Sequence, residues 1–288
     1  MTISFTANEK AILQKITIPP RPEAIIQIGE EAKKTEPDVA RIAKIIASDI
    51  GISSAVLQVV NSAAFRRNKD ITSISQAVMT LGFKRILPLV KSVALKSSMG
   101  NVDKLQVYWN EANQMANATM ATADVIGKNQ LVDQAYMLGL FHNAGIPVML
   151  MEFDDYPAIL QLANEQGWPA VGDIERERYG TSHTTISAIL AQRWKLPEVM
   201  IEVIYYQFDV DGIYSSGELS ELGLDLLSVL KIARHIVKSE TNYLTSETAY
   251  TQEWLQVEDG IIEQYGFSEA DLYNIREQVR ERLSESKS

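Results

Sequence analysis

Residues 37–65 read PDVARIAKIIASDIGISSAVLQVVNSAAF, and their apolar side chains recur at helical spacing. Pro37 and Asp38 suit the start of a helix. The apolar residues that follow on one face are Val39, Ile42, Ala43, Ile45 and Ile46. Ser53 suits the N-cap of a second helix. The apolar residues of that helix are Val56, Leu57, Val59 and Val60. This pattern favours short amphipathic helices that pack against one another.

The helical pattern continues through most of the remaining sequence. Ser73 or Ser75 begins a short helix that stops at Gly82. Residues 83–99 predict a further helix, with Pro88 near its start, where a missing N–H costs least. The longer helices are predicted at 104–127, 132–150, 154–166, 171–178, 182–193, 197–206, 224–238, 250–266 and 268–284. A strict alternation of apolar and polar residues over the length of a strand is hardly visible, so the predicted fold class is all-α.

Two irregular stretches divide this helical pattern. Residues 100–103 (GNVD) are polar and predict a boundary between an N-terminal lobe, 1–100, and a second lobe, 101–288. Residues 209–223 are rich in Gly, Ser and Asp and predict a loop. We expect the two lobes to form one module, multi-helical throughout.

Composition excludes several classes of protein. The chain has 288 residues and no cysteine, which rules out disulfides, thiolate catalysis and cysteine-based zinc sites. The N-terminus, MTISFTANEK, lacks the pattern of a signal peptide, and no apolar run is long enough to cross a bilayer. We therefore expect a soluble, cytoplasmic protein without a membrane partner.

Charge is unevenly distributed along the chain. The formal net charge of −10 disfavours binding to duplex nucleic acid. Residues 241–288 contain ten acidic and four basic residues, whereas residues 66–96 contain seven basic residues and one acidic residue. The favoured interpretation is a set of solvated helix faces. The alternative is a docking surface for an anionic partner or for the acidic C-terminal segment.

Four patterns in the first half resemble the HDOD family, the HD-related output domain. They are IPPRP at 18–22, IAKIIASDIGI at 42–52, VVNSAAF at 59–65 and ITSISQAVMTLG at 71–82. In the second half, AYMLGLFHNAG at 135–145, YGTSH at 179–183 and WKLP at 194–197 resemble the HD-like part of the same family. The resemblance covers about residues 18–240 and implies an HD-type helical fold and a role in bacterial signal transduction.

The resemblance also implies where a metal site would lie. An active HD phosphohydrolase holds a divalent ion with a histidine, an adjacent His-Asp pair and a later aspartate, and this ion activates water and neutralises the attacked phosphate. These positions match Glu111, His142 with Asn143, and Arg234. Asn143 offers one neutral amide oxygen, and the permanent cation of Arg234 would repel a metal and could pair with Glu111. We therefore expect a degenerate site with no metal, no cofactor and no catalysis.

Two further positions belong to related HD subfamilies. His183 matches a histidine of those subfamilies, and a His-His pair falls on Gln207 and Phe208. The favoured interpretation of His183 is a helix cap or a buried hydrogen-bonding group, and the alternative is a phosphate contact. For His142 the favoured interpretation is a buried core histidine bonded to Glu111, and the alternative is a remnant ligand pocket.

Three functions stay open on these grounds. The favoured one is a non-catalytic signalling module that acts through a protein partner or a small anionic ligand. The second is a metal-dependent phosphohydrolase that uses Glu111, His142 and His183 in an unorthodox arrangement. The third is a nucleotide- or nucleic-acid-binding regulator that uses the basic stretch 66–96, with Arg234 beside His142 contacting a phosphate.

Overall fold

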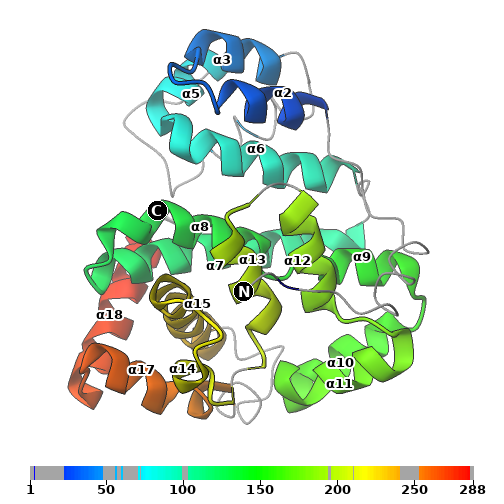
Figure 1. Cartoon of the computed structure of the whole chain (residues 1–288), viewed down its shortest axis with the longest axis vertical. Coiled ribbons are helices and arrows are strands. Elements are labelled where there is room, and N and C mark those ends of the chain that lie inside the picture. The colour runs from blue at the N-terminus through cyan, green and yellow to red at the C-terminus, as the bar shows by residue number, and fades with distance from the viewer. Residues whose placement is uncertain are drawn as a thin grey trace. The chain divides into compact units, whose positions relative to one another are not determined.

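The computed structural model of the chain describes residues 23–47, 73–98, 103–193, 196–209, 211–240 and 253–285, together with residues 3, 56, 60 and 71. Throughout these residues the secondary structure is helical, without strands, which confirms the predicted all-α class. The chain divides into two compact units (Figure 1). One contains residues 19–109 with 281–288, and the other contains residues 1–18 with 110–280.

The smaller unit contains four helices within the described residues: α2 (Glu23–Glu31), α3 (Val39–Ala47), α5 (Ile74–Leu81) and α6 (Phe83–Ser98). Helix α3 packs against α2 and α5, and α6 packs against α2 and α5. The described residues of this unit that are 0% exposed are all aliphatic, as the helical spacing predicts: Ile25, Ile28, Ile42, Ile46, Val56, Ala77, Ile86 and Val90. The apolar faces of these short helices therefore form their own core.

The ends of α5 agree with the sequence in detail. The hydroxyl of Ser73 accepts a hydrogen bond from the backbone N–H of Gln76 at 3.1 Å, so Ser73 is the N-cap. Gly82 ends the helix with a positive φ of 72°, a conformation that favours glycine. Pro88, in contrast, lies inside α6 rather than in its first turn, so its predicted position was wrong. The predicted cap Ser53 lies outside the described residues.

The larger unit is a multi-helical bundle. Its α-helices, of which the first begins and the last ends in residues assigned to the smaller unit, are α7 (Asp103–Val125), α8 (Val132–Phe141), α9 (Gly145–Glu152), α10 (Tyr156–Gln166), α11 (Trp168–Tyr179), α12 (His183–Arg193), α13 (Glu198–Tyr206), α14 (Ile213–Ser216), α15 (Glu221–Glu240), α17 (Glu258–Tyr265) and α18 (Glu269–Glu285). Two expectations were wrong. The single helix predicted at 132–150 is two helices, which break around His142 and Asn143, and the loop predicted at 209–223 contains α14.

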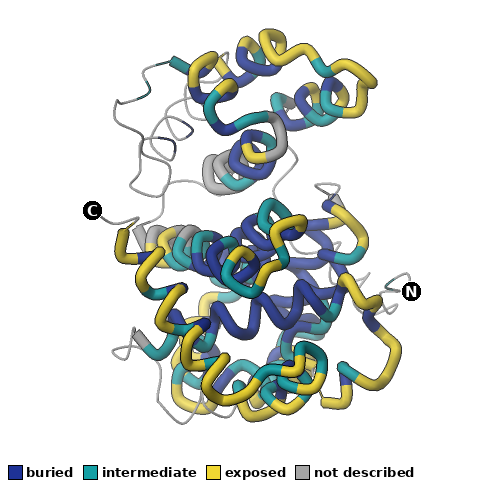
Figure 2. Tube along the Cα trace, turned by 90° about the vertical axis from the view of Figure 1, so that its left-hand side faces the viewer, coloured by how far each residue is buried: buried dark blue, intermediate teal, exposed yellow. Residues whose placement is uncertain are grey.

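Helix α12 organises the interior of the larger unit. It packs against α9 and α13, and α13 and α8 in turn pack against α15. Figure 2 shows buried residues along the inner helices of this unit, and the consecutive residues from Ile186 to Ala191 on α12 are all buried. A helix that is buried all round supplies rigid positions for side chains at its ends.

The first turn of α9 crosses α12 at very short range. A Cβ atom added to Gly145 would lie 2.1 Å from the carbonyl oxygen of His183 and 2.9 Å from the backbone nitrogen of Ser187. The backbone N–H of Gly145 also donates to the hydroxyl of Ser187 at 2.8 Å. Glycine at 145 is therefore required for the contact that places His142 beside the start of α12.

No helix among the residues that the structure describes is both long and apolar enough to cross a bilayer.

Candidate functional site

His142 follows α8 directly and is buried, with 3% of its surface exposed. Its Nδ1 atom lies 2.8 Å from the carbonyl oxygen of Gly139, so a protonated Nδ1 donates to that carbonyl. Burial, helped by the positive charge of Arg234, lowers the pKa of His142 to about 3. The ring is therefore neutral near pH 7. The expectation of a buried histidine is met, but its Nδ1 partner is Gly139 rather than Glu111.

The residues beside His142 hold its backbone and leave polar atoms free. The side-chain amide of Gln207 donates to the carbonyl of His142 at 2.7 Å and to that of Ile204 at 3.1 Å. Three buried atoms at the predicted site positions have no hydrogen-bond partner among the described residues: Asn143 Oδ1, His183 Nε2 and Gln207 Oε1. Such atoms are uncommon in protein interiors, where strain, a water molecule or a bound ion accounts for them.

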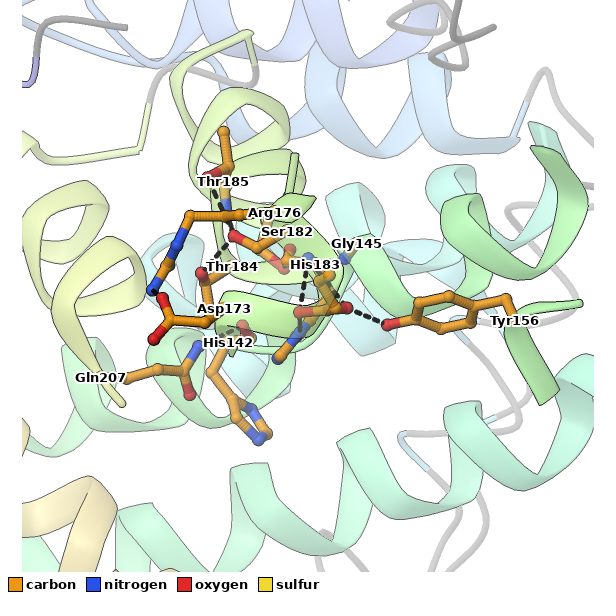
Figure 3. A network of polar contacts seen from close by, with 12 residues as sticks. His142, Gly145, Tyr156, Asp173, Arg176, Ser182, His183, Thr184, Thr185 and Gln207 are labelled. Atoms are coloured by element: carbon orange, nitrogen blue, oxygen red, sulfur yellow. Dashed lines mark hydrogen bonds and ion pairs between the residues drawn. The ribbon is translucent and has the colours of Figure 1, made fainter. Parts of the chain in front are cut away.

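A second network surrounds His183 at the start of α12 (Figure 3). The carboxylate of Glu175, fully buried on α11, lies 2.8 Å from Nδ1 of His183 and also accepts from the backbone N–H of His183. The hydroxyl of Tyr156 on α10 donates to the other carboxylate oxygen. His183 is thus a buried hydrogen-bonding group, as the favoured interpretation predicted. Its bond to Glu175 directs Nε2 away from that carboxylate.

Glu175 and Tyr156 were not predicted from the sequence. Glu175 lies in the charged run ERERY, where its neighbours Arg176 and Glu177 are exposed, so nothing in the composition distinguishes it. The spacing of eight residues to His183 is a usable signal only after the turn between α11 and α12 is known.

Arg234 belongs to a buried charge cluster, which we call the Glu253 cluster and define as Lys231, Arg234 and Glu253. The Nε atom of Arg234 lies 3.0 Å from one carboxylate oxygen of Glu253 and 3.1 Å from the other. Nζ of Lys231 lies 2.9 Å from Glu253. The expected pairing of Arg234 with Glu111 is therefore wrong.

The protonation states of the cluster follow from burial and proximity. Burial raises the pKa of Glu253, but Arg234 and Lys231 outweigh that effect and hold it at about 2. Burial lowers the pKa of Lys231, which the negative charge of Glu253 partly offsets. Glu111, half-buried on α7, acts instead on Lys238, whose pKa it raises against the effect of burial.

Phe208 connects the two networks. Its ring centroid lies 4.7 Å from the guanidinium carbon of Arg234 and 4.9 Å from Nζ of Lys231. The same ring lies 5.6 Å from the His183 ring, which in turn lies 4.1 Å from Trp168. Phe208 was predicted to stand in the place of a missing histidine. In the structure its aromatic ring lies at cation–π distance from both Lys231 and Arg234.

The described residues do not fit the divalent metal of an HD phosphohydrolase. Among them no three histidine, aspartate or glutamate side chains gather where they could hold an ion. The guanidinium of Arg234 is near enough to lower the pKa of His142, so a metal at His142 would face a buried permanent cation. Nδ1 of His142 is also occupied by the carbonyl of Gly139.

Only part of the basic stretch 66–96 lies among the residues that the structure describes. Arg66, Arg67 and Lys69 lie outside the described residues, and Lys91 is buried. Its use as a docking or nucleic-acid-binding surface stays a prediction.

Comparisons with known proteins give the chain its relatives. A family model described as the HDOD domain matches residues 18–210. An uncharacterised protein of Treponema pallidum is 27% identical over 243 residues, which are 82% of this chain and 44% of that protein. A Vibrio cholerae protein named cyclic di-GMP phosphodiesterase CdgJ is 26% identical over 134 residues, 46% of this chain and 31% of that protein.

A similar fold is found among solved structures. An HDOD domain protein of unknown function from Geobacter sulfurreducens has a TM-score of 0.68 at 19% identity, with 96% of this chain and 94% of that chain covered. At this identity the likeness shows the fold alone. The chain spans less than half the length of the curated relatives named above.

Proposed function

The chain belongs to the HDOD family, and on that premise we propose that it is a cytoplasmic signal-transduction module that acts by binding rather than by hydrolysis. Its output is contact with a signalling protein, regulated by a small anionic ligand. The net charge of −10 disfavours duplex nucleic acid as a partner.

The observation that carries this proposal is the buried position of Arg234. Its guanidinium acts electrostatically on His142 and is ion-paired to Glu253 inside the protein. In the HD enzymes that this sequence resembles, the matching position supplies an anionic metal ligand. A guanidinium stays protonated at any physiological pH, so it supplies positive charge where those enzymes hold a metal. Positive charge at a buried site favours binding of an anion but cannot activate water as a metal does.

A metal titration combined with a hydrolysis assay tests the proposal. Purified protein is titrated with Mn²⁺, Fe²⁺ and Zn²⁺ by calorimetry, then incubated with each ion and either bis(p-nitrophenyl) phosphate or cyclic di-GMP. We expect neither stoichiometric metal binding nor metal-dependent turnover. Turnover that is lost in His142→Ala but kept in His235→Ala would overturn the proposal.

Metal-dependent phosphohydrolysis is the second candidate, and one observation favours it. The partially matching Vibrio cholerae relative is named a cyclic di-GMP phosphodiesterase. The same assay decides between the two candidates, because hydrolysis of cyclic di-GMP through His142 and His183 would require metal uptake that the first candidate excludes.

A further inference from the structure

The Glu253 cluster contains two basic side chains and one acidic side chain. Lys231 and Arg234, both on α15, share the single carboxylate of Glu253, and all three side chains are at most 9% exposed. An uncompensated charge in a protein interior is costly, and proteins normally neutralise it with a counter-ion or a ligand.

The surrounding described groups do not cancel this excess. Burial keeps His142 neutral with a pKa of about 3 and His235 neutral with a pKa of about 4. Lys238 adds a positive charge that Glu111 offsets. From α18, Arg276 and Arg280 also act on His235, and both are ion-paired to Glu277. Within the described part of the chain, the neighbourhood of the Glu253 cluster is therefore electropositive.

A small pocket adjoins the same groups, and it has room for about one water molecule while Glu253 stays in place. Its lining residues are Lys231, Arg234, His235, Glu253 and Trp254. The rings of His235 and Trp254 stack with their centroids 4.5 Å apart, so this wall of the pocket is aromatic. Lys231 and Arg234 direct their N–H donors at the two oxygens of one carboxylate. A phosphate group can accept from the same donors, because carboxylate and phosphate bind guanidinium with similar geometry.

We propose that this pocket binds a phosphate group of a small molecule, and that the phosphate takes the place of the Glu253 carboxylate on Lys231 and Arg234. This inference rests on the proposed function and names its ligand chemistry and its site. A phosphate monoester carries close to two negative charges at pH 7, which matches the two cations better than one carboxylate does. Glu253 lies shortly before α17, so its release couples ligand binding to the C-terminal helices.

Calorimetric titration of the full chain with inorganic phosphate and, separately, with adenosine monophosphate tests the site. We expect the wild type to bind. Lys231→Gln leaves Arg234 and Glu253 as a one-to-one ion pair, so the variant stays folded while phosphate affinity falls by about tenfold or more, as loss of a charge-assisted hydrogen bond predicts. The matched control is Lys128→Gln, because Lys128 is ion-paired to Asp225 elsewhere in the same unit and should leave affinity unchanged.

Glu253→Gln tests the competition directly. Removal of the carboxylate frees both cations, so the apparent affinity for phosphate should rise by about tenfold or more, because the binding-competent state no longer has to displace an internal anion. Tighter binding of adenosine monophosphate than of inorganic phosphate identifies a nucleotide as the source, and equal binding identifies the phosphate group alone; both support the site.

Two results would overturn the inference. One is that the wild type binds neither probe, and the other is that Lys231→Gln binds phosphate as tightly as Lys128→Gln does. Neither result requires Glu253→Gln to fold. Neither bears on whether the protein hydrolyses phosphoesters in the presence of metal, so failure of the site and failure of the proposed function are distinguishable.

Discussion

Glu175 and Glu253 are both buried in the larger unit, and their surroundings differ. Glu175 is fully buried among groups that it meets by hydrogen bonding, namely Tyr156 and His183. Glu253 is held by Lys231 and Arg234, two cations of α15. The first carboxylate is satisfied by donors from α10 and α12, close to it along the chain. The second is satisfied by charges from a helix that ends more than ten residues before it.

The difference separates a structural role from a binding role. Hydrogen bonds from Tyr156 and His183 fix the ends of three consecutive helices and leave no excess of cations beside Glu175. The Glu253 cluster leaves an excess of positive charge that an exchangeable anion can use. We therefore expect substitutions at Glu175 to affect stability alone, and substitutions in the Glu253 cluster to affect stability and ligand binding together.

The largest effect is expected for Glu253→Leu. It leaves Lys231 and Arg234 buried without a counter-charge, so the free energy of unfolding should fall by about 3–5 kcal/mol. Urea denaturation followed by circular dichroism measures it. The triple variant Lys231→Met/Arg234→Met/Glu253→Leu removes all three charges and should recover most of that loss. If Glu253→Leu is as stable as the wild type, the cluster is not desolvated as the structure indicates.

Glu175→Gln should have a smaller effect. The amide can still accept from Tyr156, but its NH₂ group then faces the donors of His183, which costs about 1–3 kcal/mol for an unsatisfied buried group. The same denaturation experiment measures this loss, and phosphate titration should show no change relative to the wild type. A change in phosphate affinity would mean that the two glutamates do not divide structure and binding between them.

The pH dependence of stability tests the electrostatic side of the comparison. The pKa of His142 is about 3 in the folded protein, against an ordinary value of 6.5 for a solvated histidine, so the unfolded chain binds a proton that the folded chain does not. Stability is therefore present above pH 6.5 and is lost as the pH falls toward 3, at up to about 1.4 kcal/mol per pH unit.

The measurement is urea denaturation at pH 7, 6 and 5, above the range in which Glu253 titrates. His142→Gln should reduce the slope of stability against pH by about one proton. The pKa of His235 is also lowered, to about 4, so its contribution to the slope of stability against pH should persist in that variant. An unchanged slope in His142→Gln would show that the pKa of His142 is the same in the folded and the unfolded protein.

The smallest effect is expected for Tyr156→Phe. The ring of Tyr156 stays buried, and Glu175 keeps its contacts with His183 after it loses the hydroxyl. The expected loss is about 0.5–1.5 kcal/mol, the net value of one hydrogen bond. Thermal denaturation of Tyr156→Phe and Glu175→Gln under the same conditions compares their losses of stability. A larger loss in Tyr156→Phe would make the tyrosine, rather than the glutamate, the centre of that network.

Helical periodicity was enough to predict the class of the fold and many of its elements. The spacing of Ile42 and Ile46 placed the buried face of α3, and Ser73 and Gly82 marked the ends of α5. The break between α8 and α9 was missed because residues 135–149 are apolar almost without interruption, although Asn143, Gly145 and Pro147 are typical of a helix end. The break lies beside the close packing of Gly145 against α12, a tertiary contact that no local pattern records.

The site was predictable where a motif is local and unpredictable where it depends on long-range pairing. His142, Asn143 and His183 lie in short motifs, and the structure places His183 near enough to His142 to contribute to the lowered pKa of His142. The partner of Arg234 was assigned to Glu111 because the resemblance offered no other carboxylate. Glu253 lies beyond the matched residues 18–210, in a segment that was predicted to be helical and acidic but to hold no site residue.

The close crossing at Gly145 has a consequence for how such chains are recognised. Any side chain at this position would meet the backbone of α12, whatever the neighbouring histidine binds. A related protein can therefore lose every metal-binding side chain and still match the motif, provided that the glycine is kept. The glycine by which this motif is recognised reflects the contact between α9 and α12. The chemistry of the site has to be inferred from the side chains around it.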